Sequence, residues 1–132
     1  MTQEEEKQLL LQDLCGRLPY GVKVRINTKN NHYNAIVCEI TRNYICVEGG
    51  GETCFSHGTY KPYLRPMSSM TEEEHDYYNN NLITNAITIC EEKLSDYLEF
   101  MHSHHIDYRG LIPMGLGIDC TGLNIYENEK SI

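Results

Sequence analysis

The feature that most constrains the fold is a run of alternating apolar and polar residues that begins at Gly21. Within residues 21–27, three β-branched side chains alternate with polar ones, which is typical of a strand with one buried face. Three further apolar stretches follow, at 32–40, 44–48 and 52–57. Turns are predicted between them, at 28–31, 41–43 and 49–51. Short strands joined by short turns predict a four-stranded antiparallel meander, curled into a small barrel or a strongly twisted sheet.

Helical patterns flank this meander on both sides. Residues 3–15 predict an amphipathic helix with acidic side chains in its first turn, and Gly16 is its predicted end. Thr71 and Glu74 have the spacing of a capping box, which predicts a second helix over 72–80.

The longest predicted helix spans residues 84–104, where apolar residues recur at helical spacing. Leu94 and Met101 are expected on its buried face. The meander is expected to contribute five further core residues, Val22, Val24, Ile26, Val37 and Ile45. Residues 71–112 therefore form the predicted helical part, and 113–132 are expected to be loop and tail, with an edge strand as an alternative to loop before the tail. The whole chain, 1–132, is predicted to be one α+β domain with an N-terminal helix and C-terminal helices packed on the sheet.

The charge balance narrows the range of partners. The chain carries 19 acidic and 11 basic side chains, a formal net charge of −8. Affinity for nucleic acid depends on a surplus of Lys and Arg that neutralises phosphates, and anionic membranes attract basic surfaces. Neither nucleic acid nor membrane is therefore an expected partner.

The six cysteines are widely spaced, and no two of them form a CxxC pair. The first residues are acidic and lack the basic start and apolar core of a signal peptide. No apolar run approaches the ~20 residues that a membrane-spanning helix needs. We therefore expect six reduced thiols in a cytoplasmic protein.

A cluster of histidines in residues 102–107 is the strongest candidate for metal chemistry. Two ligands on one helix face need a spacing of three or four residues, and only His102 with His105 satisfies it. In the alternative interpretation the helix dipole favours these histidines, and Asp107 caps a turn over 108–112. No Walker loop, nucleophile elbow or dinucleotide fingerprint is present. We expect no metal, cofactor or catalytic residue, with a metal-dependent hydrolase that uses His102, His105 and Asp107 as an alternative.

Two segments place an arginine next to an aromatic ring at a rigid turn, close to a predicted helix start. One holds Tyr63 and Arg65 before Pro66, and the other holds Tyr108 and Arg109. Guanidinium groups bind phosphate and tyrosine rings stack on bases, so these segments predict a site for an anionic ligand. The predicted ligand-binding residues are Tyr63, Arg65, Ser68, Ser69, Tyr108 and Arg109.

A structural interpretation of the same residues stays open. Arg65 can pair with a surface glutamate, Tyr108 can lie in the core, and Arg109 can pair with Asp107 or Glu99. The net charge of −8 also works against binding an anion, unless short charge-assisted hydrogen bonds outweigh the repulsion.

Three segments resemble a group of small uncharacterised proteins found in phages and in integrated elements of gut bacteria. They read LCGRLPYGV at 14–22, KPYLRPMSSMTEEE at 61–74 and HIDYRGLI at 105–112. The order of the segments is the same in that group. The chain departs from it after Ile112, where Pro113 follows, so the resemblance assigns no role to later residues.

The resemblance implies a non-enzymatic accessory protein that counters host defence by sequestering a small phosphorylated ligand. A cyclic nucleotide that serves as a host immune signal is the expected ligand, a homo-oligomer the expected assembly, and the host cytosol the expected location. Two alternatives stay open. The acidic surface could inhibit a host enzyme, or the histidines could hydrolyse the signal.

Overall fold

The structure is a computed structural model that describes residues 2–27, 32–48, 54–57, 59–84, 88–89, 94–123 and 125–126. Some predicted features lie outside these residues: the turns at 28–31 and 49–51, the start of the strand 52–57, parts of the helix 84–104 and the tail 127–132.

The N-terminal helix α1 spans Gln3–Arg17, two residues beyond its predicted end. A capping box satisfies its first amides. Gly16, the predicted stop, remains helical, and a short 3-10 turn, η1 (Leu18–Tyr20), continues from the helix. The chain turns toward the sheet at Gly21, whose φ of 71° lies in the left-handed region that glycine adopts without strain.

Four strands run antiparallel in chain order, as the alternating pattern predicted. They are β1 (Lys23–Asn27), β2 (His32–Ile40), β3 (Tyr44–Val47) and β4 (Cys54–Ser56). Each strand pairs with the next one along the chain, and a bulge near Cys38 shifts the register between β2 and β3.

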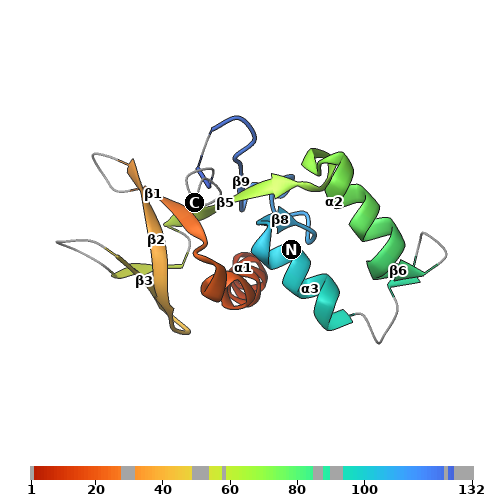
Figure 1. Ribbon diagram of the computed structural model, residues 1–132. Helices are drawn as coiled ribbons and strands as arrows, with labels where there is room; N and C mark the ends of the chain where they lie inside the picture. The colour runs from red at the N-terminus through yellow and green to blue at the C-terminus, as the bar shows by residue number, and fades with distance from the viewer. Residues whose placement is uncertain are drawn as a thin grey trace.

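The sheet extends beyond this meander and stays open, so the barrel alternative is wrong (Figure 1). β5 (Tyr60–Pro66) lies antiparallel to β1, and β8 (Ile106–Asp107) and β9 (Ile118–Asp119) both pair with β5 in parallel. The order is β4-β3-β2-β1-β5-β8, with β9 also on β5. β9 falls in the region that was predicted to be loop or edge strand.

The helical part is shorter than predicted. α2 spans Glu72–Tyr77 behind the predicted capping box, and a π turn, η3 (Tyr78–Leu82), follows it.

The predicted helix 84–104 is wrong in its first part. β6 (Ile83–Thr84) and β7 (Thr88–Ile89) form a small antiparallel hairpin, and α3 spans Leu94–Ser103. The Ile and Thr side chains of this segment lose rotamer freedom in a helix and suit a strand, which outweighs the helical spacing of the apolar positions.

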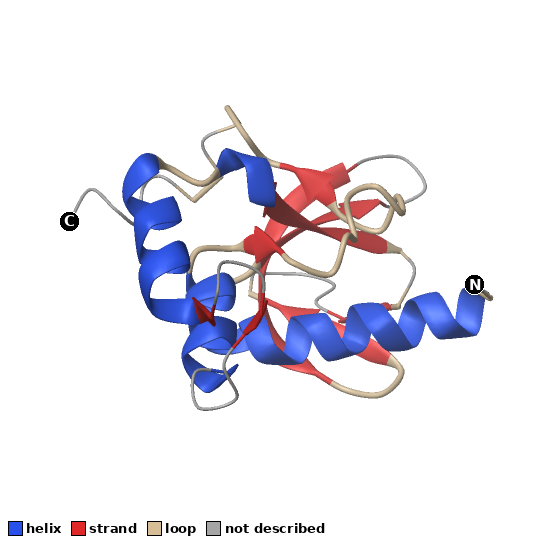
Figure 2. Ribbon diagram, turned by 90° about the vertical axis from the view of Figure 1, so that its right-hand side faces the viewer, coloured by secondary structure: helices blue, strands red, loops and turns tan. Residues whose placement is uncertain are grey.

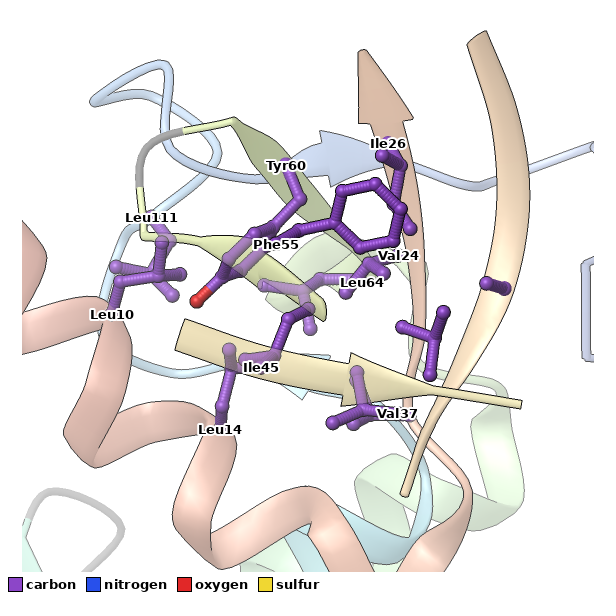
Figure 3. Packing of buried hydrophobic residues seen from close by; sticks show 13 residues of the cluster. Leu10, Leu14, Val24, Ile26, Val37, Ile45, Phe55, Tyr60, Leu64 and Leu111 are labelled. Atoms are coloured by element: carbon purple, nitrogen blue, oxygen red, sulfur yellow. The ribbon is translucent and has the colours of Figure 1, made fainter. Parts of the chain in front are cut away.

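α1 lies along the sheet and closes the main hydrophobic core (Figure 2). Figure 3 shows Leu14 of α1 beside Ile45 of β3, and Leu10 of α1 beside Leu111. The core comprises Leu10, Leu14, Val22, Val24, Ile26, Ala35, Val37, Ile45, Val47, Phe55, Tyr60, Leu64 and Leu111. The five predicted core residues of the meander all belong to it.

The described residues of α3 pack in a second cluster rather than on the meander, which corrects the predicted C-terminal cover. Met101 is buried there with Met70 and Ile106. Leu94 is 49% exposed, so its predicted place in the core is wrong. Figure 1 shows α1 between β2 and β3 on one side and α3 on the other.

Candidate functional site

The three segments that carry the resemblance meet around β8. Arg65 of β5 lies opposite Ile106 in the parallel register, and its backbone N–H donates to the His105 carbonyl at 2.7 Å. From α1, Arg17 Nη2 donates to the Ile106 carbonyl at 2.6 Å. A strand of two residues therefore joins parts of the chain that are far apart in the sequence.

The Arg65 guanidinium is fully used inside the protein. A guanidinium carries five N–H donors. Nη1 and Nη2 donate to the two carboxylate oxygens of Glu74 at 3.0 and 2.6 Å, and Nη1 also donates to the His104 carbonyl at 3.3 Å. Nη2 donates to the Ser69 carbonyl at 3.0 Å, and Nε donates to Ser69 Oγ at 3.3 Å. All five donors have acceptors, so this geometry favours the structural interpretation of Arg65.

Glu74 is the acceptor that fixes this arrangement. Burial acts to raise the pKa of Glu74, but hydrogen bonds from Arg65 and from the Thr71 backbone N–H outweigh it and lower the pKa from 4.5 to about 2. Glu74 is therefore ionised at neutral pH. It closes the capping box of α2 and pairs with Arg65 at the same time.

A buried ion pair lies where α1 meets β8. Asp13 and Arg17 are both fully buried, one helical turn apart. Arg17 donates from Nε to Asp13 Oδ2 at 2.7 Å and from Nη2 to Oδ1 at 3.2 Å. Arg109 Nε also donates to Asp13 Oδ1, at 3.2 Å. Two arginines thus share one buried carboxylate.

The remaining faces of this cluster are aromatic. The guanidinium of Arg17 lies 5.6 Å from the centre of the Tyr108 ring, and that of Arg109 lies 5.1 Å from it. Both distances allow cation–π attraction. Tyr108 therefore packs within the fold, as its structural interpretation held, and the acidic partner of Arg109 is Asp13 rather than Asp107 or Glu99.

His102 packs against α1 at the edge of this cluster. Its Nε2 lies 2.8 Å from the Tyr108 hydroxyl. A Cβ atom built on Gly16 would lie only 2.3 Å from the Cε1 atom of the imidazole, so the glycine permits the close approach. Gly16 thus serves helix packing rather than helix termination.

The surroundings of His102 favour its neutral form. Burial is the main cause that lowers its pKa below 6.5, and the positive charge of Arg17 lowers the pKa further. Asp13 partly opposes this effect, and Arg109 adds to the lowering.

The predicted ligand-binding residues are not brought together in one place. Tyr63 is buried, donates its hydroxyl to Asn34 Oδ1 at 2.5 Å, and packs with Cys120 and Tyr126. Ser69 supports Arg65, whereas Ser68 is exposed. Tyr108 and Arg109 belong to the cluster around Asp13 described above. Of the two arginines, Arg109 keeps more exposure, with 28% of its side chain accessible.

The predicted metal ligands of the hydrolase alternative face three different partners. His102 contacts Tyr108, His105 stacks on the Tyr126 ring at 3.5 Å, and Asp107 accepts from the backbone N–H groups of Leu111 and Ile112 at 2.9 Å each. Asp107 thus holds the following turn, close to its expected capping role. Across the described ranges, the His, Cys, Asp and Glu side chains form no group of three or more that could bind a metal ion.

A groove of about 410 Å³ lies between α2 and α3. Its walls combine carboxylates with aromatic rings. Tyr77, which is 43% exposed, stacks on Phe100 with the ring centres 5.1 Å apart, and the His104 ring lies 4.4 Å from Phe100. The residues that line it are Glu73, Glu74, Tyr77, Asp96, Glu99, Phe100, Ser103 and His104. Among these described lining residues there is no Lys or Arg.

Sequence reasoning did not find this groove. The sequence pattern assigned Glu74 a capping role and Glu99 only a possible pairing with Arg109. The available signal was the spacing within α3: Asp96, Glu99 and Ser103 recur at three and four residues, which places them along one side of a helix.

A second groove, of about 400 Å³, lies beside α1 and β5 and has a different character. Two lysines, Lys7 and Lys61, line it together with one carboxylate, Glu6; the other lining residues are Gln3, Leu10, His57, Thr59, Tyr60 and Leu116. Neither lysine forms an ion pair with any residue in the described part of the chain.

No protein-family model, curated protein or solved structure matches the chain. The resemblance of the three segments therefore stays an expectation. None of the helices formed by the described residues has both the length and the apolar character needed to cross a bilayer.

Proposed function

We propose that the protein is a non-enzymatic binding module whose α2–α3 groove holds a Lys or Arg side chain of a partner protein. The observation that carries the proposal is the composition of the groove. Glu73, Asp96 and Glu99 supply carboxylates beside the stacked rings of Tyr77 and Phe100. In this proposal the acidic surface of the inhibitor alternative acts through the α2–α3 groove.

The groove offers a cation two kinds of favourable contact, with carboxylates and with aromatic rings. A hydrogen bond between a cationic donor and a carboxylate contributes about 1.5–3 kcal/mol. A cation over an exposed aromatic ring contributes roughly 0.5–1 kcal/mol more. Arg65 already neutralises Glu74, so Glu73, Asp96 and Glu99 are the carboxylates that remain for a ligand.

The shape of the groove favours a side chain that arrives on a polypeptide. The groove is open to solvent between two helices, so a chain can pass along it while one side chain enters. Its volume of about 410 Å³ accommodates such a side chain with its neighbours. The net charge of −8 steers a basic segment toward the protein and raises the rate of encounter.

A peptide titration tests the proposal. A fluorescent arginine-rich peptide is titrated with the protein at low salt, and a matched peptide with Gln in place of each Arg serves as the ligand control. The variant Glu73→Gln/Glu99→Gln is expected to bind the basic peptide at least about tenfold more weakly, because a tenfold change corresponds to only ~1.4 kcal/mol. The control variant Glu4→Gln/Glu39→Gln changes the net charge equally, at exposed sites outside the groove, and should bind nearly as the wild type does.

Two results would contradict the proposal. Equal weakening in the two double variants would show that overall charge, rather than the groove, attracts the peptide. Equal affinity of the wild type for the Arg and Gln peptides would show that no cation is recognised.

The phosphorylated ligand stays a second candidate, and the groove beside α1 is its best position. The observation that favours it is the unpaired state of Lys7 and Lys61 among the described residues. Incubation with a panel of cyclic nucleotides, followed by heat release and chromatography, would detect a bound ligand. Lys61→Gln should abolish binding in this groove, whereas Arg109→Gln, which lies outside the groove, should leave it intact.

A further inference from the structure

Three cysteines from neighbouring strands lie on the outer face of the sheet. Cys46 of β3 is directly opposite Cys54 of β4 in the antiparallel register, and Cys38 lies at the bulge of β2. The adjacent residues Val37, Ile45 and Phe55 face the core, so alternation turns the three thiols outward. Cys38 and Cys54 are exposed, and Cys46 is partly covered.

The thiols of Cys46 and Cys54 are in contact. Their Sγ atoms lie 2.9 Å apart, and Cys38 Sγ donates to the Cys46 carbonyl at 3.4 Å. All three cysteines are free thiols in the structure.

The strand geometry permits a covalent bond between Cys46 and Cys54. Asn43 and His57 are opposite each other in the register of β3 and β4, and the hydrogen bond from His57 N–H to the Asn43 carbonyl makes them a hydrogen-bonded pair. Hydrogen-bonded and non-hydrogen-bonded pairs alternate along an antiparallel ladder, so Cys46 and Cys54, three positions further on, are a non-hydrogen-bonded pair. The Cα atoms of such pairs lie about 4.5 Å apart. This separation falls within the range of about 4.4–6.8 Å that a disulfide spans without movement of the backbone.

We propose that Cys46 and Cys54 are a redox-active dithiol that closes to a cross-strand disulfide by exchange with a small-molecule disulfide such as oxidised glutathione. The exposed Cys54, as thiolate, attacks one sulfur of the small disulfide and expels one thiolate. Cys46 then loses its proton and attacks the Cys54 sulfur of the mixed disulfide, which expels the second thiolate. The protein loses two protons and two electrons, and the small disulfide is reduced to two thiols.

The electrostatics of the pair agree with this order of attack. The hydrogen bond with Cys54 is the main cause that raises the pKa of Cys46 to about 11, with smaller contributions from burial and from Cys54, Glu39 and Cys38 as charged neighbours. Cys46 therefore keeps its proton at neutral pH, while its sulfur stays in contact with that of Cys54. The first attack falls to Cys54, and Cys46 becomes competent when Cys54 is in the mixed disulfide and no longer carries charge.

The disulfide would fasten β4 to β3 at one end of the sheet. β4 is a terminal strand of the sheet path and pairs only with β3 among the described strands. Cross-linking removes conformational freedom from the unfolded chain, and for a short closed loop we expect the melting temperature to rise by on the order of 5 °C. The equilibrium between dithiol and disulfide would thus determine the stability of the β3–β4 pair.

The test uses the full chain with an excess of oxidised glutathione at pH 8, quenched by acid and analysed by intact mass and non-reducing peptide mapping. The wild type should lose two hydrogen atoms and yield one peptide linked through Cys46 and Cys54. Cys46→Ser should instead stop at the mixed disulfide and gain one glutathione on Cys54. Cys38→Ser and Cys120→Ser are the controls and should form the Cys46–Cys54 bond as the wild type does.

A wild type that accumulates glutathione on Cys54 without closing the bond would overturn the proposal. A map in which Cys54 pairs with Cys38 or with any other cysteine would overturn it as well. The melting temperature gives an independent reading: reduction of the oxidised wild type should reverse its increase, and the same treatment should leave Cys46→Ser/Cys54→Ser unchanged.

Discussion

The two hydrophobic clusters of the protein are built in different ways. The cluster under α1 is mainly aliphatic and lies between one helix and a regular antiparallel sheet. The cluster around α3 is rich in aromatic rings and methionine, with Tyr97 packed edge-on against Tyr108 and Tyr78 tilted against Tyr97. The first cluster draws most of its residues at a period of two from neighbouring strands. The second collects its residues from α3, from β8 and the residue that follows it closely, and from the turns before and after α2.

Polar groups join the two regions. α1 contributes Leu10 and Leu14 to the first cluster, and one turn later Arg17 reaches the β8 carbonyl beside the second. Arg17 is held in place by Asp13, and both side chains are fully buried. The comparison indicates that packing in the aliphatic cluster stabilises the sheet with α1, while buried hydrogen bonds fix the position of the aromatic cluster relative to them. Substitutions at this junction should separate the two contributions.

The largest effect is expected for Asp13→Ala. The substitution leaves the Arg17 charge buried without its carboxylate, which destabilises a protein by about 3–5 kcal/mol. Urea unfolding followed by circular dichroism measures the loss. The double variant Asp13→Leu/Arg17→Met is the control, because an apolar pair of similar volume avoids the unpaired charge and should recover most of the stability. A loss below about 1 kcal/mol in Asp13→Ala would show that the junction does not depend on this pair.

A smaller loss is expected for Gly16→Ala. In an exposed helix this change stabilises by roughly 0.5–1 kcal/mol, because alanine loses less backbone entropy than glycine. Here the new methyl group would overlap the His102 ring, and such overpacking costs about 1–3 kcal/mol. Cys15→Ala, at the exposed neighbouring position of α1, is the control and should change stability little. A gain of stability in Gly16→Ala would contradict the close approach of α1 and α3.

The protonation of His102 should lower the free energy of unfolding by less than Gly16→Ala does, because it adds a charge to the ring without changing how the ring packs. Burial and the positive charge of Arg17 lower the pKa of His102 in the folded state below 6.5. At a pH between the lowered pKa of the folded state and the pKa of 6.5 in the unfolded state, the unfolded chain binds more protons than the folded protein. The free energy of unfolding should therefore fall as the pH drops below 6.5. Urea unfolding at pH 7.5 and 5.5 compares the wild type with His102→Gln. The wild type should lose more stability than the variant, and equal losses would contradict a depressed pKa.

The part of the fold that follows from alternation was predictable. β1, β2 and β3 were recognised because Val22 to Ile26 and the stretches after them each keep one apolar face, and the core confirms those residues. β5 and β8 were not predicted as strands, and the pairing of β9 with β5 was not predicted. β8 and β9 are two residues long, and their pairing with β5 is parallel, so no local turn signals it. Residues 83–89 combine apolar positions at helical spacing with β-branched residues, and Ile83–Thr84 and Thr88–Ile89 are strands in the structure.

The candidate sites were less predictable than the fold, because they depend on contacts between distant segments. Arg65 and Arg109, which the sequence offered as ligand contacts, both bind carboxylates of the protein itself in the structure. Whether an arginine faces a ligand or a glutamate nine residues away depends on where β5 ends and α2 begins. The Cys46–Cys54 pair shows the same limit, since its residues are brought together by strand register rather than by sequence spacing.

The smallest effect is expected for Leu94→Asp, and it tests the comparison of the two clusters most directly. Helical spacing in the sequence placed Leu94 in the core with Met101, in which case a buried aspartate would unfold the protein. In the structure Leu94 is the first residue of α3 and is 49% exposed, while Met101 is fully buried. An aspartate in the first turn faces the positive end of the helix dipole, which favours it by up to about 1 kcal/mol and offsets the lost apolar contact. We therefore expect a change within about 0.5 kcal/mol, as for other exposed positions. Met101→Ala on the same helix is the control and should cost about 2–5 kcal/mol. If Leu94→Asp is as destabilising as Met101→Ala, α3 presents a different face to the second cluster, and the α2–α3 groove has a different lining.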